Sequence, residues 1–198
     1  MPAVSFPALR LAEARDASAI AAIYAPAVLE RATSFEFVPP TSEEMARRVA
    51  AVAPSFPWLV AERSGAVIGY AYGSRHKERD AYAWSVDVSA YVRADCHRQG
   101  IGRGLYTALF ALLALQGYRR AWAGVTLPNP GSVGLHESMG FRHLGTYEAV
   151  GWKFGRWHDV AWFGRALGPL DPEPAPPLPT SEARALPAWN QALQWSSP

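Results

Sequence analysis

The run from His97 to Leu105 has the residue types and spacing needed to bind a phosphate group. Glycines at positions 100 and 102 allow a ligand to approach the backbone closely. The run follows a predicted strand and opens a predicted helix, where unpaired N–H groups bind phosphate oxygens. Arg98 and Arg103 add positive charge, although either could equally be a solvated side chain. The run therefore indicates a cofactor that carries a diphosphate.

Two well-known diphosphate sites do not fit this run. A P-loop requires Gly-Lys followed by Ser or Thr, and the run contains no such sequence. The dinucleotide fingerprint fits poorly, because no Asp or Glu ends the next predicted strand, near residues 120–127. A diphosphate cofactor without a ribose-binding acid remains, with loop glycines that bind no ligand as the alternative.

Helical patterns surround the run. Leu105, Leu109, Leu112 and Leu113 repeat at helical spacing, and Gly117 supplies a C-cap, so we expect a buried helix over residues 100–117. Two helices are expected earlier in the chain. One follows Asp16 and is kinked or ended by Pro26, and the other starts at the capping box of Thr41 and Glu44. A fourth helix, residues 132–139, should stop at Gly140.

Strand patterns alternate with these helices. We expect a hairpin of residues 58–62 and 66–72 around a Ser64-Gly65 turn, and a long strand over residues 82–92. Further strands are expected at residues 120–125, 141–146 and 159–165. This order of elements predicts an α/β (α+β) fold with one sheet and helices on both of its faces.

The size and composition of the chain indicate one domain with an appendage. A chain of 198 residues, 49% of them apolar, can bury one core. We place this domain at residues 1–167. Residues 168–198 contain six prolines between positions 169 and 179, which indicates an extended linker. Residues 180–195 could form a short terminal helix docked through Trp189 and Trp195, but the composition favours a mobile tail.

Several classes of protein are disfavoured. The net charge of +2 comes from interspersed charges, so we expect no nucleic-acid partner. The longest apolar run, residues 105–115, is too short to span a bilayer, and residues 1–16 do not read as a signal peptide. Cys96 is the single cysteine, which excludes a disulfide framework and a Cys-rich zinc site. We expect a soluble, cytoplasmic protein with no metal.

The sequence resembles the GNAT acetyltransferase superfamily at several separated points. Tyr91-Val92 through Gly100-Ile101-Gly102-Arg103 resembles its acetyl-CoA motif, and Asn129-Pro-Gly-Ser132 through Phe141 resembles its second helix motif. The resemblance is closer to the phosphinothricin acetyltransferase branch and runs from about residue 9 to 167. It is carried by Tyr24-Ala-Pro-Ala27-Val28, Thr33-Ser-Phe35-Glu36, Pro57-Trp58-Leu-Val-Ala-Glu62, Tyr82-Ala-Trp84-Ser-Val86 and Lys153-Phe-Gly155-Arg-Trp157-His158-Asp159-Val160.

This resemblance implies a GNAT fold, with a mixed, mostly antiparallel sheet, and a homodimer. It implies transfer of acetyl from acetyl-CoA to the α-amino group of a small acceptor such as phosphinothricin, methionine sulfoximine or methionine sulfone. The residues implied to bind acetyl-CoA are Ala90, Tyr91, Val92, Arg98, Gln99, Gly100, Ile101, Gly102, Arg103, Asn129 and Ser138. Those implied on the acceptor side are Phe35, Glu36, Lys77, Arg79, Tyr82, Asp87, Val88 and Ser89.

Two residues are candidates for proton transfer. An amine attacks a thioester only when it is neutral, and the family's usual glutamate base corresponds to Asp87. Aspartate is one methylene shorter, so we expect it to act through a bridging water; alternatively it pairs with Lys77, Arg79 or another cation. His136 stands where many members have a tyrosine that assists the leaving thiolate. It could donate a proton, relay one from Asp87, or simply pack within its helix.

Further alternatives concern the acceptor and the activity. Lys77 and Arg79 precede the strand of Asp87 and could bind an acidic group of the acceptor, or only be solvated in a polar loop. A GNAT acting on another amine, such as a protein N-terminus, a polyamine or an aminoglycoside, is one alternative. A non-catalytic acyl-CoA-binding module is the other, and aspartate in place of the usual glutamate is its best argument.

Overall fold

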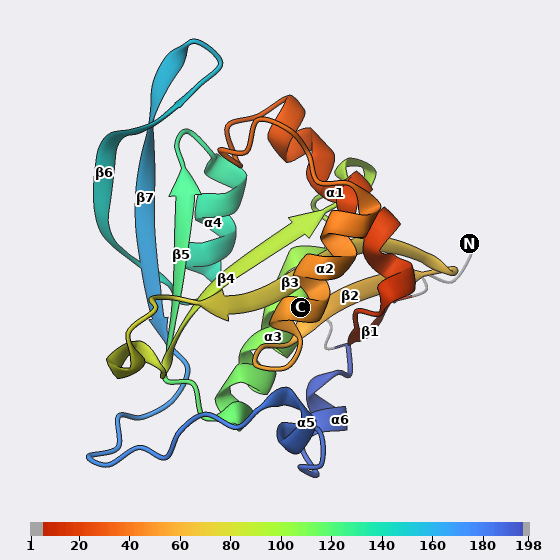
Figure 1. Cartoon of the computed structure of the whole chain (residues 1–198), viewed down its shortest axis with the longest axis vertical. Coiled ribbons are helices and arrows are strands. Elements are labelled where there is room, and N and C mark those ends of the chain that lie inside the picture. Colours follow the sequence, from red (N-terminus) through yellow and green to blue (C-terminus); the bar gives the residue numbers. More distant parts are fainter. Residues whose placement is uncertain (1–5, 196–198) are drawn as a thin grey trace.

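Seven strands form one mixed sheet in the computed structural model, which describes residues 6–195 (Figure 1). The strand order is β1-β2-β3-β4-β5-β7-β6. All neighbouring pairs are antiparallel except β4 with β5, which is parallel. The fold class expected from the sequence is thereby confirmed. The strands are β1 (Ala8–Leu11), β2 (Trp58–Arg63), β3 (Ala66–Arg75), β4 (Ser85–Val92), β5 (Arg120–Thr126), β6 (Arg142–Lys153) and β7 (Arg156–Ala166).

The parallel strands β4 and β5 pair over only three positions. Ser85, Val86 and Asp87 stand opposite residues 120–122, and pairing ends there. β4 nevertheless continues beside β3 as far as Val92. Figure 1 shows the two arrows diverging beyond this point. The edge of β4 that faces β5 is therefore free of strand pairing after Asp87, which leaves backbone groups available to a ligand.

Helices cover both faces of the sheet (Figure 1). α1 (Ala17–Leu29) and α2 (Ser42–Val52) enclose one core, which includes Ile20, Met45 and Tyr70. α3 (Ile101–Gln116) and α4 (Pro130–Ser138) pack on the opposite face around a core that includes Leu109 and Phe141. The apolar positions of β4 alternate accordingly. Val86 and Val88 face the α3 side, whereas Tyr91 packs with the α1 side.

The predicted C-cap of α3 is present, and α2 has the Thr41 half of its predicted capping box. The hydroxyl of Thr41 accepts a hydrogen bond from the amide of Glu44 at 3.1 Å. Gly100 and Gly117 flank α3 in the left-handed conformation, with φ of 79° and 100°, which glycine adopts without steric cost. Pro26, by contrast, does not end α1, which continues to Leu29.

Two strand predictions need correction. The strand expected over residues 82–92 begins only at Ser85, because Asp80–Tyr82 form a single 3₁₀ turn, η2. The strands expected at residues 141–146 and 159–165 are longer and pair with each other as one hairpin, β6 and β7. Phe154 and Gly155 form its two-residue turn with positive φ values of 50° and 73°, which suit the twist of paired strands.

The proline-rich stretch of residues 169–179 has no helix or strand and is mostly exposed, as its composition indicates, but the segment that follows it packs on α3. It forms two single-turn helices, α5 (Thr180–Ala183) and α6 (Trp189–Ala192). Trp189 is only 2% exposed, and the side chain of Gln116 donates to the carbonyl of Leu178 at 2.9 Å. The ring of Trp195 occupies the space that a Cβ at Gly104 would fill. These contacts explain why residues 180–195 are packed on α3, although the composition of the segment favours a mobile tail.

None of the helices within residues 6–195 combines the length and the apolar character needed to cross a membrane. The division at residues 167 and 168 stays a prediction.

Candidate active site

Asp87 lies at the last paired position of β4 and β5, on the face of the sheet that α1 and α2 cover. Its Oδ1 is 2.7 Å from Nδ1 of His76, the residue that follows β3. Burial raises the pKa of Asp87, and the charges of His76 and Lys77 oppose this rise. The carboxylate therefore has one specific partner and an environment that favours uptake of a proton.

His76 is itself held by aromatic rings. Its imidazole stacks on Trp122 of β5 with a centroid distance of 5.4 Å, and the ring of Trp162 of β7 meets it edge-on at 6.3 Å. Tyr82 approaches the same imidazole at 6.1 Å and is partly exposed. These three aromatic contacts orient the imidazole so that its Nδ1 points at Asp87. The side chain paired with Asp87 is thus His76, rather than Lys77 or Arg79.

The other residues expected on the acceptor side lie in different environments, from exposed to fully buried. Lys77 and Arg79 are exposed, and neither forms an ion pair within residues 6–195. Ser89 lies on the same face of β4 as Asp87, two residues along the strand. Val88 is buried in the α3 core, so its side chain does not line an acceptor site, and only its backbone could contact a ligand.

The loop between α1 and α2 carries Phe35 and Glu36. Glu36 accepts hydrogen bonds from both terminal nitrogens of Arg48, at 2.8 and 3.0 Å, and from the hydroxyl of Tyr24. Its hydrogen bonds with Arg48 lower the pKa of Glu36. Glu36 is therefore an anion already paired within the protein, and both Phe35 and Glu36 are partly buried.

Tyr72 links this loop to Asp87. Burial is the main cause that raises the pKa of Tyr72, and the charges of Arg48, Glu36 and Asp87 act on the same phenol. Glu36 of this loop and the carboxylate of Asp87 therefore both act on the phenol of Tyr72.

The phosphate cradle, which is the part of the predicted phosphate-binding run at residues 98–103, has open amides. Within the described chain, the backbone N–H groups of residues 98–103 donate no hydrogen bond, and Gly104 is the first residue of α3 that does. Arg98 and Gly100 adopt positive φ values of 59° and 79°, which turn this backbone away from a regular helix start. A Cβ at Gly102 would lie 3.1 Å from Leu135 of α4, so glycine allows α4 to approach. These open amides fit a diphosphate group.

Two side chains of the cradle, Gln99 and Arg103, hydrogen-bond to neighbouring segments and hold its backbone in place. Gln99 donates to the carbonyl of Asp95 at 3.0 Å and accepts from Arg63 at 2.9 Å, which fastens the loop to the end of β2. Arg103 reaches the carbonyl of Ser138 at 3.5 Å and so bridges α3 and α4. Ile101 is buried in the core below. Gln99 and Ile101 could thus meet a cofactor only through their backbones or through the outer surface of Gln99.

Backbone groups of β4 and polar groups of α4 flank the gap between β4 and β5. Ala90 and Tyr91 lie on the part of β4 that no longer pairs with β5. The carbonyl of Val92 accepts a hydrogen bond from His97 at 2.8 Å, which leaves its other groups for a ligand. Asn129 caps α4 by accepting from the amide of Ser132 at 3.1 Å, and its amide nitrogen is unused among the described contacts.

His136 has the contacts of a packing residue. Its Nδ1–H donates to the carbonyl of Ser132 at 2.7 Å, and its Nε2 accepts from the hydroxyl of Tyr106 at 3.1 Å. Burial lowers the pKa of His136 and so favours the neutral imidazole. Both ring nitrogens are engaged and the side chain is buried. These contacts favour the packing alternative over proton donation.

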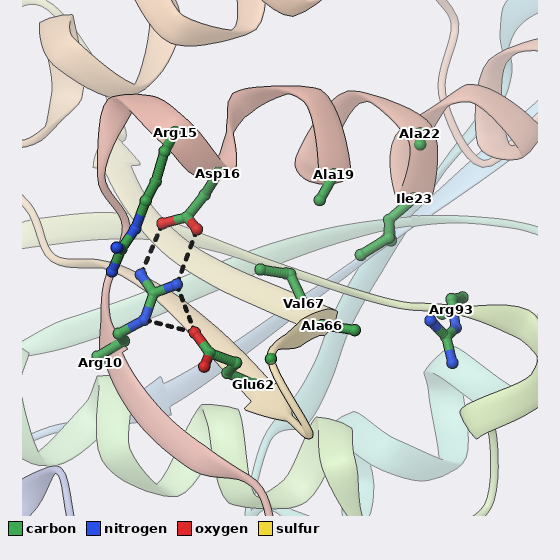
Figure 2. Close-up of a pocket in the computed structure, with 11 residues that line it drawn as sticks. Arg10, Arg15, Asp16, Ala19, Ala22, Ile23, Glu62, Ala66, Val67 and Arg93 are labelled. Atoms are coloured by element: carbon green, nitrogen blue, oxygen red, sulfur yellow. Dashed lines mark hydrogen bonds and ion pairs between the residues drawn. The ribbon is translucent and has the colours of Figure 1, made fainter.

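A separate pocket of about 580 Å³ lies between the start of α1 and the β2–β3 turn (Figure 2). It is rich in arginine, but its cations are paired. Arg10 binds Asp16 and Glu62, Arg15 binds Glu13, and Arg93 binds Asp95. Because protein carboxylates already take these charges, the pocket offers little to an anionic ligand. Within residues 6–195, no group of His, Cys, Asp and Glu side chains is arranged to hold a metal ion.

Two residues of this site carry only weak signals in the sequence. His76 stood in a loop of charged residues, and nothing in its neighbours indicated that the strand pairing would bring it to Asp87. Arg48 lies on the amphipathic helix α2, where an arginine is usually a solvated side chain. The pairing of His76 with Asp87 follows from the register of β3 against β4, which the sequence alone does not reveal.

Comparisons with known proteins agree with this geometry. Residues 9–162 match the family described as acetyltransferase (GNAT) domain. A phosphinothricin N-acetyltransferase of Streptomyces viridochromogenes is 38% identical over 86% of this chain and 93% of its own. An L-methionine sulfoximine/L-methionine sulfone acetyltransferase of Salmonella typhimurium is 33% identical over 78% and 91%.

A solved structure gives the same result for the fold. The GNAT superfamily phosphinothricin acetyltransferase of Sinorhizobium meliloti, crystallised in complex with acetyl-CoA, superimposes with a TM-score of 0.82 at 36% identity. The match covers 86% of this chain and 94% of that one. With its open amides at the start of α3 and its diverging strands β4 and β5, the chain belongs to the GNAT acetyltransferase family, among the relatives of the phosphinothricin acetyltransferases.

Proposed function

We propose that this protein transfers the acetyl group of acetyl-CoA to the α-amino group of a small amino-acid-like acceptor, of the phosphinothricin, methionine sulfoximine or methionine sulfone type. The observation that carries the proposal is the placement of the Asp87–His76 pair where β4 and β5 separate. The names of the relatives support this class of acceptor.

Asp87 acts as the base in this proposal. The α-amino group of an amino acid is an ammonium ion at neutral pH and must lose a proton before it can attack a carbonyl carbon. The Asp87 carboxylate accepts this proton through a bridging water, since aspartate is short, and His76 fixes its orientation. The buried position that raises the pKa of Asp87 also makes the carboxylate a stronger base.

The remaining residues bind and orient. When bound, acetyl-CoA supplies the thioester whose acetyl group is transferred. The amides of residues 98–103 hold its diphosphate, and Ala90 and Tyr91 hold its pantetheine arm along the unpaired edge of β4. Lys77 and Arg79, whose charges have no carboxylate partner among the described residues, bind an acidic group of the acceptor. We assign His136 the role of fixing α4 against Tyr106.

A coenzyme A release assay tests the proposal. Purified protein is supplied with acetyl-CoA and, separately, with methionine sulfone, methionine sulfoximine, phosphinothricin, a polyamine and a peptide with a free N-terminus. We expect turnover with at least one of the first three and little with the last two. Turnover confined to the polyamine or peptide would identify a GNAT with another acceptor. Calorimetric binding of acetyl-CoA without turnover on any amine would identify a non-catalytic acyl-CoA-binding module.

We also propose a homodimer, as the resemblance implies. The support in the structure is an exposed apolar surface on the β6–β7 hairpin. The side chains of this surface, the hairpin patch, are each about half exposed or more. Large exposed apolar patches on proteins usually mark interaction sites. The residues of the hairpin patch are Leu144, Tyr147, Val150, Trp152, Phe154 and Trp157.

A further inference from the structure

A lysine is buried at the end of β6. This is unusual, because buried strand positions are mostly apolar and lysine side chains are mostly exposed to solvent. Lys153 is only 2% exposed. Its Nζ donates to three backbone carbonyls, those of Val28 at 2.6 Å, Arg31 at 3.2 Å and Ser34 at 2.6 Å. These carbonyls belong to the end of α1 and the loop that follows it, more than 110 residues away in the sequence.

The three carbonyls match the three hydrogens of an ammonium group. A buried ammonium is costly unless each hydrogen has an acceptor, so the loop must hold all three carbonyls around the Nζ of Lys153. The three carbonyls, in turn, have no other hydrogen-bond donor in the described structure besides regular helix contacts and Lys153. Removal of the ammonium would therefore leave acceptors unpaired inside the protein.

The same loop touches the hairpin at a second point. The ring of Phe35 lies directly over Gly151, and a Cβ there would come within 2.2 Å of the ring. Phe35 also packs near His158 of β7, with ring centroids 6.2 Å apart. Lys153 and Gly151 thus hold one side of the loop, while Arg48 and Tyr24 hold Glu36 on its other side.

We propose that Lys153 is a positioning residue for the acceptor: its ammonium fixes the loop of residues 30–36 to the β6–β7 hairpin and so places Phe35 beside the amino-acid-like substrate. This inference rests on the proposed function, because it takes Phe35 as a wall of the acceptor site. It assigns Lys153 no contact with the substrate and no role in binding acetyl-CoA.

Kinetics of Lys153→Met provide the first test. Methionine has a similar length and can fill the same space, but it donates no hydrogen bond to the carbonyls. We expect the KM for the acceptor to rise about tenfold or more, with the KM for acetyl-CoA changed less than about twofold. The matched control is Gly145→Ala, in the same strand, where an added Cβ meets nothing within 4 Å and both constants should stay unchanged.

Gly151→Ala perturbs the loop without removing a buried charge. Its Cβ forces the ring of Phe35 to move, so this variant should also raise the KM for the acceptor and spare that for acetyl-CoA. If Lys153→Met does not fold, this variant still tests whether the position of Phe35 controls binding of the acceptor. An equal rise of both KM values, or no change in the KM for the acceptor in either variant, would overturn the inference.

Hydrogen exchange separates this inference from the proposed function. Amides of residues 30–36 should exchange about tenfold faster or more in Lys153→Met than in Gly145→Ala, because the loop has lost its attachment. This readout needs no substrate. If exchange accelerates but no amino acid is acetylated by the wild-type protein, the proposed function fails and the attachment stands. If exchange is equal in the two variants, the attachment by Lys153 is refuted whatever the protein acetylates.

Discussion

Asp87 and Trp122 are the last residues that β4 and β5 pair, so the carboxylate stands where the two strands begin to separate. A ligand that enters the gap along β4 would bring its reactive end toward this carboxylate. The position is set by strand register, and it requires no flexible loop to carry the base.

Replacement of Asp87 by asparagine should remove the base and keep the shape of the side chain. We expect kcat/KM for the acceptor to fall by about 10²–10⁴-fold, the usual contribution of a positioned base. Affinity for acetyl-CoA, measured by calorimetry, should change little. Asp80→Asn is the matched control, because Asp80 lies exposed in η2 close to the same site. Equal activity of Asp87→Asn and wild type would exclude the carboxylate from the reaction.

The pH profile should respond to His76. The hydrogen bond from His76 lowers the pKa of Asp87, opposing the rise caused by burial. His76→Phe keeps a ring to stack on Trp122 and removes that hydrogen bond. The pKa of Asp87 should then rise further, and because a base works only when deprotonated, the acidic limb of the profile should move to higher pH. A limb that stays in place, or moves to lower pH, would contradict the pairing.

Gly100 combines a backbone requirement with a binding role. Alanine at this left-handed position should cost about 1–2 kcal/mol of unfolding free energy. Distortion of the neighbouring amides should also weaken coenzyme A binding, by about tenfold or more in calorimetry. Gly155→Ala is the matched control, since Gly155 has a similar φ of 73° at the hairpin turn. Both variants should lose stability, and only Gly100→Ala should lose affinity for the coenzyme.

Local patterns account for the features that the sequence predicts well. The leucines of α3 and its two flanking glycines determine that helix, and the glycine spacing at residues 100–104 places the open amides. The Ser64-Gly65 turn likewise defines the β2–β3 hairpin. These features depend on neighbours within a few residues, which periodicity and turn chemistry can describe.

Contacts between distant segments explain what the sequence could not predict. His76 reaches Asp87 through the register of β3 against β4, and Lys153 reaches Ser34 across 119 residues. Neither residue type nor spacing indicates such a partner. The side chains of Val88 and His136 are also buried, which for His136 favours the packing alternative. The motif places a residue in the site, but packing decides which way its side chain faces.

The C-terminal segment should contribute to the stability of the whole protein. Trp189 is buried against the core around α3, so Trp189→Ala should lower the free energy of unfolding by about 3–5 kcal/mol. Leu170→Ala, at a residue 68% exposed in the same segment, should change it by less than about 0.5 kcal/mol. Urea denaturation measures both. A tail that detaches readily in solution would give two variants of equal stability.

The hairpin patch should mediate association of two copies. Trp152 and Trp157 form an edge-to-face pair with ring centroids 5.3 Å apart, and both are more than half exposed. Burial of such rings against a second copy would remove a large apolar area from water, and aromatic residues are enriched where interfaces gain most of their energy. Trp157→Ser should therefore shift the dimer toward monomer in sedimentation equilibrium over a range of concentrations. Leu170→Ser removes an equally exposed apolar side chain outside the patch and should leave the dimer intact. A wild-type protein that is monomeric at all concentrations, or a dimer insensitive to Trp157→Ser, would show that this surface has no such role.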